Sequence, residues 1–185
     1  MGDGQANVAL IEVNIQSIHQ LFNSMDPSPF IERDLDHDAE EFIVSWAQEH
    51  PKTAEMKLVV HLVQKPEHDN PTKLLTDSIH HFFAYKAESN HHAFRQLMRE
   101  GWISLLIGLS FLVACVIISH TLAPHLKGWQ QVMKEGLTIM GWVAMWRPIE
   151  IYLYRWWPLR SLGRIYARLS TIPVDVRLSP GVNPN

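Results

Sequence analysis

The chain has 185 residues, of which 46% are hydrophobic, and a formal net charge of −3. Residues 1–94 carry 15 acidic and 6 basic side chains, whereas residues 95–185 carry 4 acidic and 10 basic ones together with six of the seven tryptophans. The acidic half would repel phosphate, which argues against nucleic-acid binding, and the single Cys115 excludes an intramolecular disulfide.

The first predicted elements are a strand, a helix and a second strand. We expect residues 1–7 to be disordered and find no signal-peptide pattern in them. The stretch "VALIEVNIQSI" (8–18) alternates apolar and polar side chains, as a strand with one buried face does. "DLDHDAEEFIVSWAQEH" (34–50) predicts a helix with an acidic first turn, and "MKLVVHLVQ" (56–64) is apolar on both faces, which indicates a central strand.

A long helix should begin at Asn70 or Thr72 and pack on the sheet through an apolar stripe of Leu74, Leu75, Ile79, Phe82 and Phe83. Near the other end, "IPVDVRL" alternates again and predicts a strand within 171–178. The sequence thus predicts a β-α-β-α head over residues 8–94, with parallel strands, completed by this C-terminal strand and followed by a disordered tail at 179–185.

The second half of the chain contains the candidate membrane segments. Trp102 to Ser119 is an 18-residue run without a charge, enough for a spanning helix of roughly 27 Å. The alternative, a core helix of a soluble protein, requires a larger chain to enclose it. We expect residues 95–120 to continue the long helix into a first span, 121–135 to form a periplasmic loop, and 136–157 to form a second span. The expected fold is therefore a cytoplasmic α/β head on a two-helix transmembrane hairpin.

The distribution of basic residues predicts the orientation. Arg95 and Arg99 precede the first run, and five arginines accompany or follow the second, whereas the connecting segment has only Lys127 and Lys134. Because loops rich in Lys and Arg stay in the cytoplasm, both termini should be cytoplasmic. We expect a multi-pass protein of a bacterial inner membrane, in contact with membrane lipids.

Arg147, Pro148 and Glu150 interrupt the second apolar run. Between Glu135 and Arg147 lie 11 uncharged residues, or roughly 16 Å of helix, so these charges fall within the inner half of a bilayer. Arg147 and Glu150 are three residues apart and face each other on a helix. They are either part of an interfacial anchor, or an intramembrane polar site for an ion, a proton or a partner subunit. The anchor interpretation includes an aromatic belt of Trp142, Trp146, Tyr152, Tyr154, Trp156 and Trp157.

Two histidine clusters occur on the long helix. Asp77 precedes His80 and His81, and Glu88 precedes His91 and His92, with the same spacing after 11 residues. The clusters are roughly 16 Å apart along one helix, so one ion cannot use both. They form either a solvated face or a metal-binding or pH-sensing site that needs a second copy of the chain.

The segment 158–170 predicts an amphipathic interfacial helix. Its apolar face contains Leu159, Leu162, Ile165, Tyr166 and Leu169. Arg155, Arg160, Arg164 and Arg168 would meet anionic lipid headgroups, although the apolar face could equally pack on the head.

The sequence lacks a phosphate-binding loop, a dinucleotide fingerprint, paired cysteines and a nucleophile elbow, so we expect neither enzymatic activity nor a cofactor. "LFNSMDPSPF" together with "WRPIEIYLYRWWPLR" resembles a family of small, uncharacterised bacterial inner-membrane proteins with two spans. The resemblance implies this topology and a bacterial origin, and no activity.

Three functions remain open at this point. The preferred one is a non-enzymatic assembly or accessory subunit, because a small sheet with open edges and isolated intramembrane charges favours a homo-oligomer or a place in a larger membrane complex. The others are a homo-oligomeric channel or transport component, and a metal- or pH-sensing membrane protein.

Overall fold

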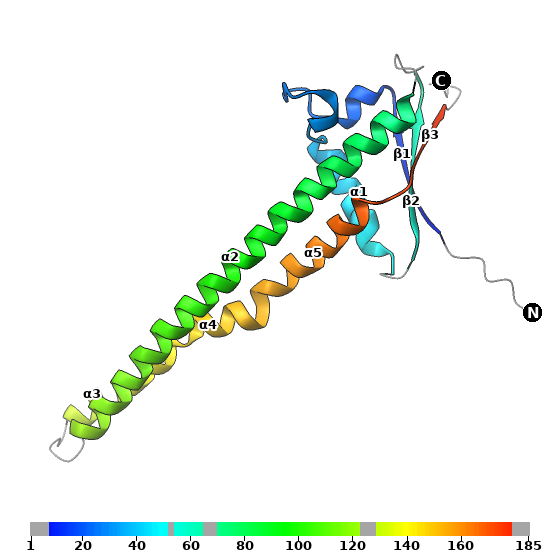
Figure 1. The fold of residues 1–185 in the computed structure, drawn as a ribbon. Helices are drawn as coiled ribbons and strands as arrows, with labels where there is room; N and C mark the ends of the chain where they lie inside the picture. The colour runs from blue at the N-terminus through cyan, green and yellow to red at the C-terminus, as the bar shows by residue number, and fades with distance from the viewer. Residues whose placement is uncertain (1–7, 52–53, 65–69, 123–128, 179–185) are drawn as a thin grey trace, which may run out of the picture. The chain divides into compact units, whose positions relative to one another are not determined.

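The computed structural model describes residues 8–51, 54–64, 70–122 and 129–178 (Figure 1). The chain forms two compact units. The first, here the sheet unit, comprises Met1–Ser89 and Leu162–Asn185, and the second, here the apolar unit, comprises Asn90–Ser161. The ends predicted to be disordered, 1–7 and 179–185, and residues 123–128 of the predicted loop lie outside the described residues.

Three parallel strands form the sheet, in the order β1-β2-β3. They are β1 (Ala9–Ile15), β2 (Met56–Leu62) and β3 (Val174–Leu178). Val59 of β2 is opposite Glu12 of β1 and Asp175 of β3, which fixes the register of all three. The prediction of a central strand at 56–64 is confirmed, because β2 pairs with both neighbours.

Local capping interactions start the helices of the sheet unit. Helix α1 (His37–Glu49) begins after Asp36, whose carboxylate accepts a hydrogen bond from the Asp38 N–H at 3.0 Å. Helix α2 (Pro71–Leu122) begins with a proline, which suits a first turn, and Asn70 Oδ1 accepts from the Lys73 N–H at 3.2 Å. The short 3-10 helices η1 (Ile18–Leu21) and η2 (Phe30–Glu32) lie between β1 and α1.

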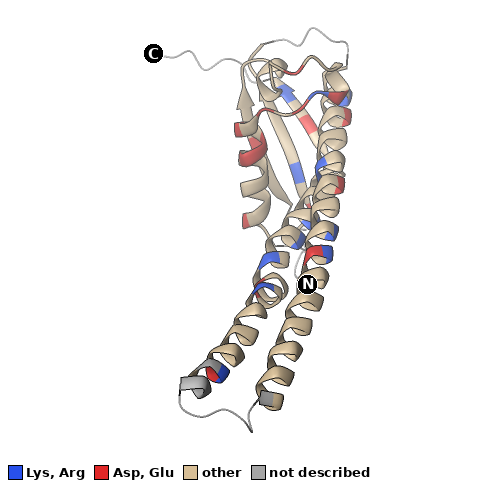
Figure 2. Ribbon diagram, turned by 90° about the vertical axis from the view of Figure 1, so that its left-hand side faces the viewer, with Lys and Arg blue, Asp and Glu red and all other residues tan. Residues whose placement is uncertain are grey.

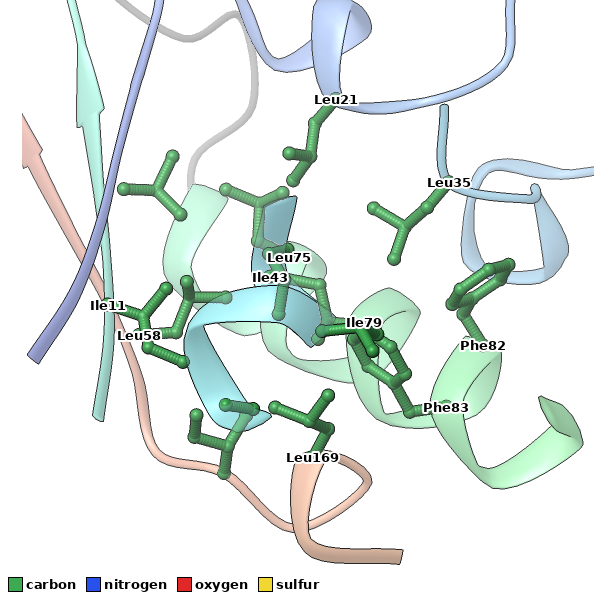
Figure 3. Close-up of a cluster of buried hydrophobic side chains, with 14 of the residues drawn as sticks. Ile11, Leu21, Leu35, Ile43, Leu58, Leu75, Ile79, Phe82, Phe83 and Leu169 are labelled. Atoms are coloured by element: carbon green, nitrogen blue, oxygen red, sulfur yellow. The ribbon is translucent and has the colours of Figure 1, made fainter. Parts of the chain in front are cut away.

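Helices α1, α2 and the end of α5 (Trp156–Leu169) supply the core that covers one face of the sheet (Figure 3). Ile11 and Leu58 point from the strands into this core, where each is fully buried. The same core cluster contains Ile43 of α1 and Leu75, Ile79 and Phe83 of α2. It also contains Leu169 of α5. Period-two alternation in the strands and the helical stripe of α2 therefore select the buried surfaces.

The predicted fold class, an α/β head on a two-helix transmembrane hairpin, is wrong. The described chain is mainly helical, with one helix of 52 residues, α2, and a small three-stranded parallel sheet. Among the described residues α2 is the one helix long and apolar enough to cross a membrane. The second apolar segment is divided into α3 (Trp129–Ala144), α4 (Trp146–Glu150), a π-helical turn (Ile151–Arg155) and α5.

Proline 148 explains why the second segment is not one helix. It has no N–H to donate to the carbonyl of Ala144, so the helical hydrogen bonding stops there. Met145 forms a turn (φ −79°, ψ −9°), and α4 restarts with Pro148 in its first turn, where an N–H is not needed. The indole N–H of Trp156 donates to the Tyr152 carbonyl at 2.7 Å within the π-helical turn that follows. Hydropathy identifies an apolar run here but does not show this division.

Burial on α2 gives a direct test of the core. Phe83 is fully buried, whereas Tyr85, two residues later, is 59% exposed. Phe83→Ala should lower the free energy of unfolding of the sheet unit by about 3–5 kcal/mol, and Tyr85→Ala should change it by less than about 0.5 kcal/mol. Hydrogen exchange of the β2 amides in mild detergent measures this free energy. Equal effects of the two substitutions would contradict the assigned core.

Candidate functional site

Arg147 and Glu150 form an ion pair on the surface of the apolar unit. Arg147 Nη1 lies 3.6 Å from Glu150 Oε2, and the two side chains are 55% and 38% exposed. Pro148 directly follows Arg147 and Ile151 directly follows Glu150, and both are buried. The pair therefore occupies an accessible flank of α4 and is not enclosed by the unit.

Close contacts with α2 show the level at which this pair lies. A Cβ atom built on Gly101 would be 2.9 Å from Ile151 Cγ2, and one built on Gly108 would be 2.8 Å from the Ala144 carbonyl oxygen. At Gly141 of α3, the same construction meets Leu112 of α2 at 2.9 Å. Residues later in α2 thus meet residues earlier in the second segment, which makes the packing antiparallel. The ion pair lies between the first two contacts, beside residues 101–108 of α2.

That level lies within the charge-free part of α2. No Lys, Arg, Asp or Glu occurs between Glu100 and the end of α2 at Leu122, so this half of the helix is tan in Figure 2. On the second segment the charge-free stretch is shorter, from Gly136 to Trp146. The ion pair consequently sits beside apolar residues of α2 instead of beyond them. An ionisable pair beside an apolar helix surface is a candidate functional site.

The apolar unit exposes large hydrophobic side chains on both packed segments. On α2 they are Trp102, Ile103, Leu106, Ile107, Leu109, Phe111, Val113, Val116, Ile117 and Ile118. On α3, α4 and the π-helical turn they include Ile139, Met140, Trp142, Val143, Trp146, Leu153 and Tyr154. Soluble monomers rarely expose a continuous apolar surface of this extent, which therefore indicates a membrane or a protein partner.

Gly108 and Pro148 belong to the same structural feature. Because Pro148 cannot donate to it, the Ala144 carbonyl lacks its usual helical partner. Gly108 faces that carbonyl, and a Cβ at this position would be 2.8 Å from the carbonyl oxygen, too close for any side chain. The sequence patterns described above do not identify this role of glycine. Gly101 and Gly108 are seven residues apart on one face of α2, and this spacing is the signal that could have identified it.

The two histidine clusters are not brought together. His80 Nε2 is 2.7 Å from the carbonyl oxygen of Ile172 and so links α2 to the segment before β3. The other predicted residues of this site are exposed along α2: Asp77, His81, Glu88, His91 and His92. In the described parts of the chain, no three His, Cys, Asp or Glu side chains are placed to hold a metal ion.

The four arginines predicted to meet lipid headgroups have different surroundings. Arg168 Nη2 donates to the Ala54 carbonyl at 2.7 Å, within the sheet unit. The Arg160 guanidinium lies over the Trp156 ring, 5.7 Å from its centroid, while Arg155 and Arg164 are exposed. The apolar face of α5 contributes Ile165 and Leu169 to the core of the sheet unit, with Leu162 and Tyr166 packed against it.

The sheet face opposite the core carries ionisable side chains that lie close to one another. Lys57 Nζ lies 3.1 Å from Asp175 Oδ2, Arg177 Nε lies 3.5 Å from the same oxygen, and His61 Nε2 lies 3.9 Å from Glu12 Oε1. The hydrogen bond from the Lys57 ammonium lowers the pKa of the Asp175 carboxyl. These pairs surround the buried Val59, which explains how an apolar side chain is shielded on this face. They fit a structural role.

Comparison with protein-family models, with curated proteins and with solved structures finds no match for this chain. The resemblance to two-span bacterial inner-membrane proteins therefore stays a prediction.

Two glycine substitutions test the packing behind the ion pair. Gly108→Ala would place a methyl group against the Ala144 backbone and should lower the free energy of unfolding by about 1–3 kcal/mol. Gly136→Ala is the matched control, since a Cβ there meets no described atom within 4 Å and alanine favours a helix by about 1 kcal/mol. Thermal unfolding in mild detergent should rank the proteins as Gly136→Ala at or above wild type and Gly108→Ala below it. The reverse order would show that the two segments do not approach in this way.

Proposed function

We propose that this chain is a non-enzymatic membrane protein that acts as an assembly or accessory subunit. In this proposal the apolar half of α2 lies in the lipid bilayer, and the face around Arg147 and Glu150 contacts a second protein chain. The observation that supports it most directly is the exposed, charge-free surface of α2. Within the most apolar 18-residue window of that helix, only 17% is buried.

A free-energy argument supports a membrane environment. Burying a large apolar side chain contributes about 1.5–3 kcal/mol, so a half-exposed one forgoes on the order of 1 kcal/mol. Ten such residues of α2, exposed by 39% to 64%, together forgo on the order of 10 kcal/mol in water. That equals the whole stability of a typical domain, about 5–15 kcal/mol. Lipid removes this cost because its chains are as apolar as the exposed side chains.

The ion pair supports an assembly role within that membrane. Charged side chains in apolar surroundings need partners, and each member of this pair retains exposed surface after pairing. A second copy related by a two-fold axis would bring Arg147 of one copy to Glu150 of the other, because such an interface is self-complementary. The exposed neighbours Trp146, Ile149 and Leu153 are apolar, which suits a helix contact better than a polar transport pathway.

The sheet supports the orientation that we propose. Since β1, β2 and β3 belong to one sheet, the chain leaves the sheet unit through α2 and returns to it through α5. Both ends of the described chain therefore belong on one side of the bilayer. Arg95, Arg99, Arg155 and Arg160 flank the apolar surface where the chain leaves and returns. By the positive-inside rule this is the cytoplasmic side, and we propose a bacterial inner membrane as the location.

Alkaline extraction of membranes tests the location. We expect the protein to stay in the membrane pellet at high pH, as integral proteins do. Ile107→Arg should shift it toward the soluble fraction, because arginine in the middle of an inserted helix costs about 2.5–3.5 kcal/mol. Tyr85→Arg, at a similarly exposed position of α2 in the sheet unit, is the control and should have no effect. Wild-type protein in the soluble fraction would refute the membrane proposal.

Opposite charge reversals test the assembly role. A copy carrying Arg147→Glu has two acidic residues at the site, and a copy carrying Glu150→Arg has two basic ones. In vesicles, energy transfer between labelled copies should show the mixed pair forming on the order of tenfold more than either variant with itself, for an interhelical polar contact of about 1–2 kcal/mol. The matched reversals Lys73→Glu and Asp77→Arg, in the sheet unit, should show no such preference. Random mixing of the first two variants would exclude this face as the assembly surface.

A further inference from the structure

Four arginines from two separate segments gather at one end of the apolar unit. Arg95 and Arg99 lie on α2, Arg155 ends the π-helical turn, and Arg160 lies on α5. All four are exposed, and in the described part of the chain none is within ion-pair distance of a carboxylate. We refer to these four residues as the arginine collar.

Two contacts between α2 and the second segment place the collar arginines in the same stretch of the apolar unit. At one limit, Asn90 Nδ2 donates to the Leu159 carbonyl at 2.7 Å. At the other, Gly101 packs on Ile151 and Tyr152. Arg95, Arg99 and Arg155 lie between these limits, and Arg160 is one residue beyond Leu159. The span along α2 is 11 residues, or about 16 Å, and Arg95 and Arg99 lie about 6 Å apart along it.

Tryptophans lie where the charge-free part of α2 begins and within the arginine collar itself, since Trp156 and Trp157 come between Arg155 and Arg160. Trp102 is 59% exposed and begins the charge-free part of α2, immediately after Glu100. On the second segment, Trp157 is 66% exposed, and Trp156 lies under the Arg160 guanidinium. Tryptophan prefers the interface between hydrocarbon and water, so this end of the unit has the residue order expected at a membrane surface.

From this arrangement we infer that the arginine collar binds the phosphate headgroups of anionic phospholipids and selects them over zwitterionic ones. The inference rests on the proposed membrane location and names a lipid class for it. A guanidinium group pairs with a phosphate through two parallel hydrogen bonds. A zwitterionic headgroup also carries a positive group, which offsets the charge of its phosphate and weakens its attraction to the collar. Glu100 is the acidic residue within the same level of α2, and it leaves the four arginines in excess by three charges. The collar differs from the arginine row predicted along 155–168 in two ways. Arg168 donates a hydrogen bond to the Ala54 carbonyl in the sheet unit, and α2 contributes two of the four collar arginines.

The tryptophans of the chain allow this selectivity to be measured directly. Purified full-length protein is reconstituted in vesicles of phosphatidylcholine containing a fraction of brominated phosphatidylglycerol, and quenching is compared with vesicles in which the phosphatidylcholine is brominated. We expect stronger quenching by the anionic lipid at equal mole fraction, and a smaller difference as sodium chloride is raised. Each arginine removed should lower the preference by about fivefold, until both lipids quench equally.

Two paired variants and one control locate the effect. Arg95→Gln with Arg99→Gln, and Arg155→Gln with Arg160→Gln, should each reduce the preference, and the four together should abolish it. Lys73→Gln with Arg177→Gln removes the same charge from the sheet unit and should leave the preference unchanged. Circular dichroism checks that these surface substitutions keep the helical fold. Replacing chloride by inorganic phosphate at constant ionic strength should not weaken the preference, because the collar extends over two segments beside lipid.

Three outcomes overturn the inference. Equal quenching by both lipids in wild-type protein shows that there is no selectivity, and preference retained in the fourfold variant places it elsewhere. Competition by inorganic phosphate shows a soluble-anion site instead of a lipid site. If the protein stays in the pellet on alkaline extraction while the preference is absent, the inference fails and the proposed membrane location survives. If the protein extracts as soluble, the membrane location itself fails.

Discussion

Both units depend on the unbroken backbone hydrogen bonding of α2 from Pro71 to Leu122. In its first half, Leu75, Ile79 and Phe83 complete the core that covers one face of the sheet. In its second half, Gly101 and Gly108 provide the flat surface on which the second apolar segment packs. After Pro71 the helix contains no proline that would break it, so a single element carries the core of one unit and the packing surface of the other.

In the second apolar segment, a local break in the helix packs against a residue far away in sequence. Pro148 removes one backbone donor and ends α3 at Ala144. The carbonyl left without its partner then lies against Gly108, where the absence of a side chain allows close approach. Small residues have the same use in membrane helices, where association depends on close packing and not on the hydrophobic effect. A break in a helix and a glycine on its neighbour thus form one feature of the packing.

The charges of the apolar unit fall into two groups with different surroundings. Arg147 and Glu150 lie beside the charge-free part of α2 and pair with each other. The collar arginines lie beyond that part, next to Trp102 and Trp157, and have no acidic partner in the part of the chain that is described. A pair inside an apolar layer can exchange partners with a neighbouring helix, whereas unpaired arginines at its boundary attract anions. The two proposals, assembly and selection of anionic lipid, use these two groups separately.

The sequence by itself determined the local features: the alternating segments where the three strands lie, the two-sided apolar pattern that makes β2 central, the stripe of α2, and the spacing of Arg147 and Glu150. These depend on residues close together in the chain. It also predicted that the long helix continues through residues 95–120, but not that the second segment is divided at Pro148, nor that Gly108, 40 residues away, packs against the Ala144 carbonyl. It also grouped the arginines by their spacing along 155–168, whereas the structure places Arg95 and Arg99 with Arg155 and Arg160 and gives Arg168 to Ala54. Only the tertiary structure decides such sets, because antiparallel packing brings together residues whose separation in sequence carries no periodic signal.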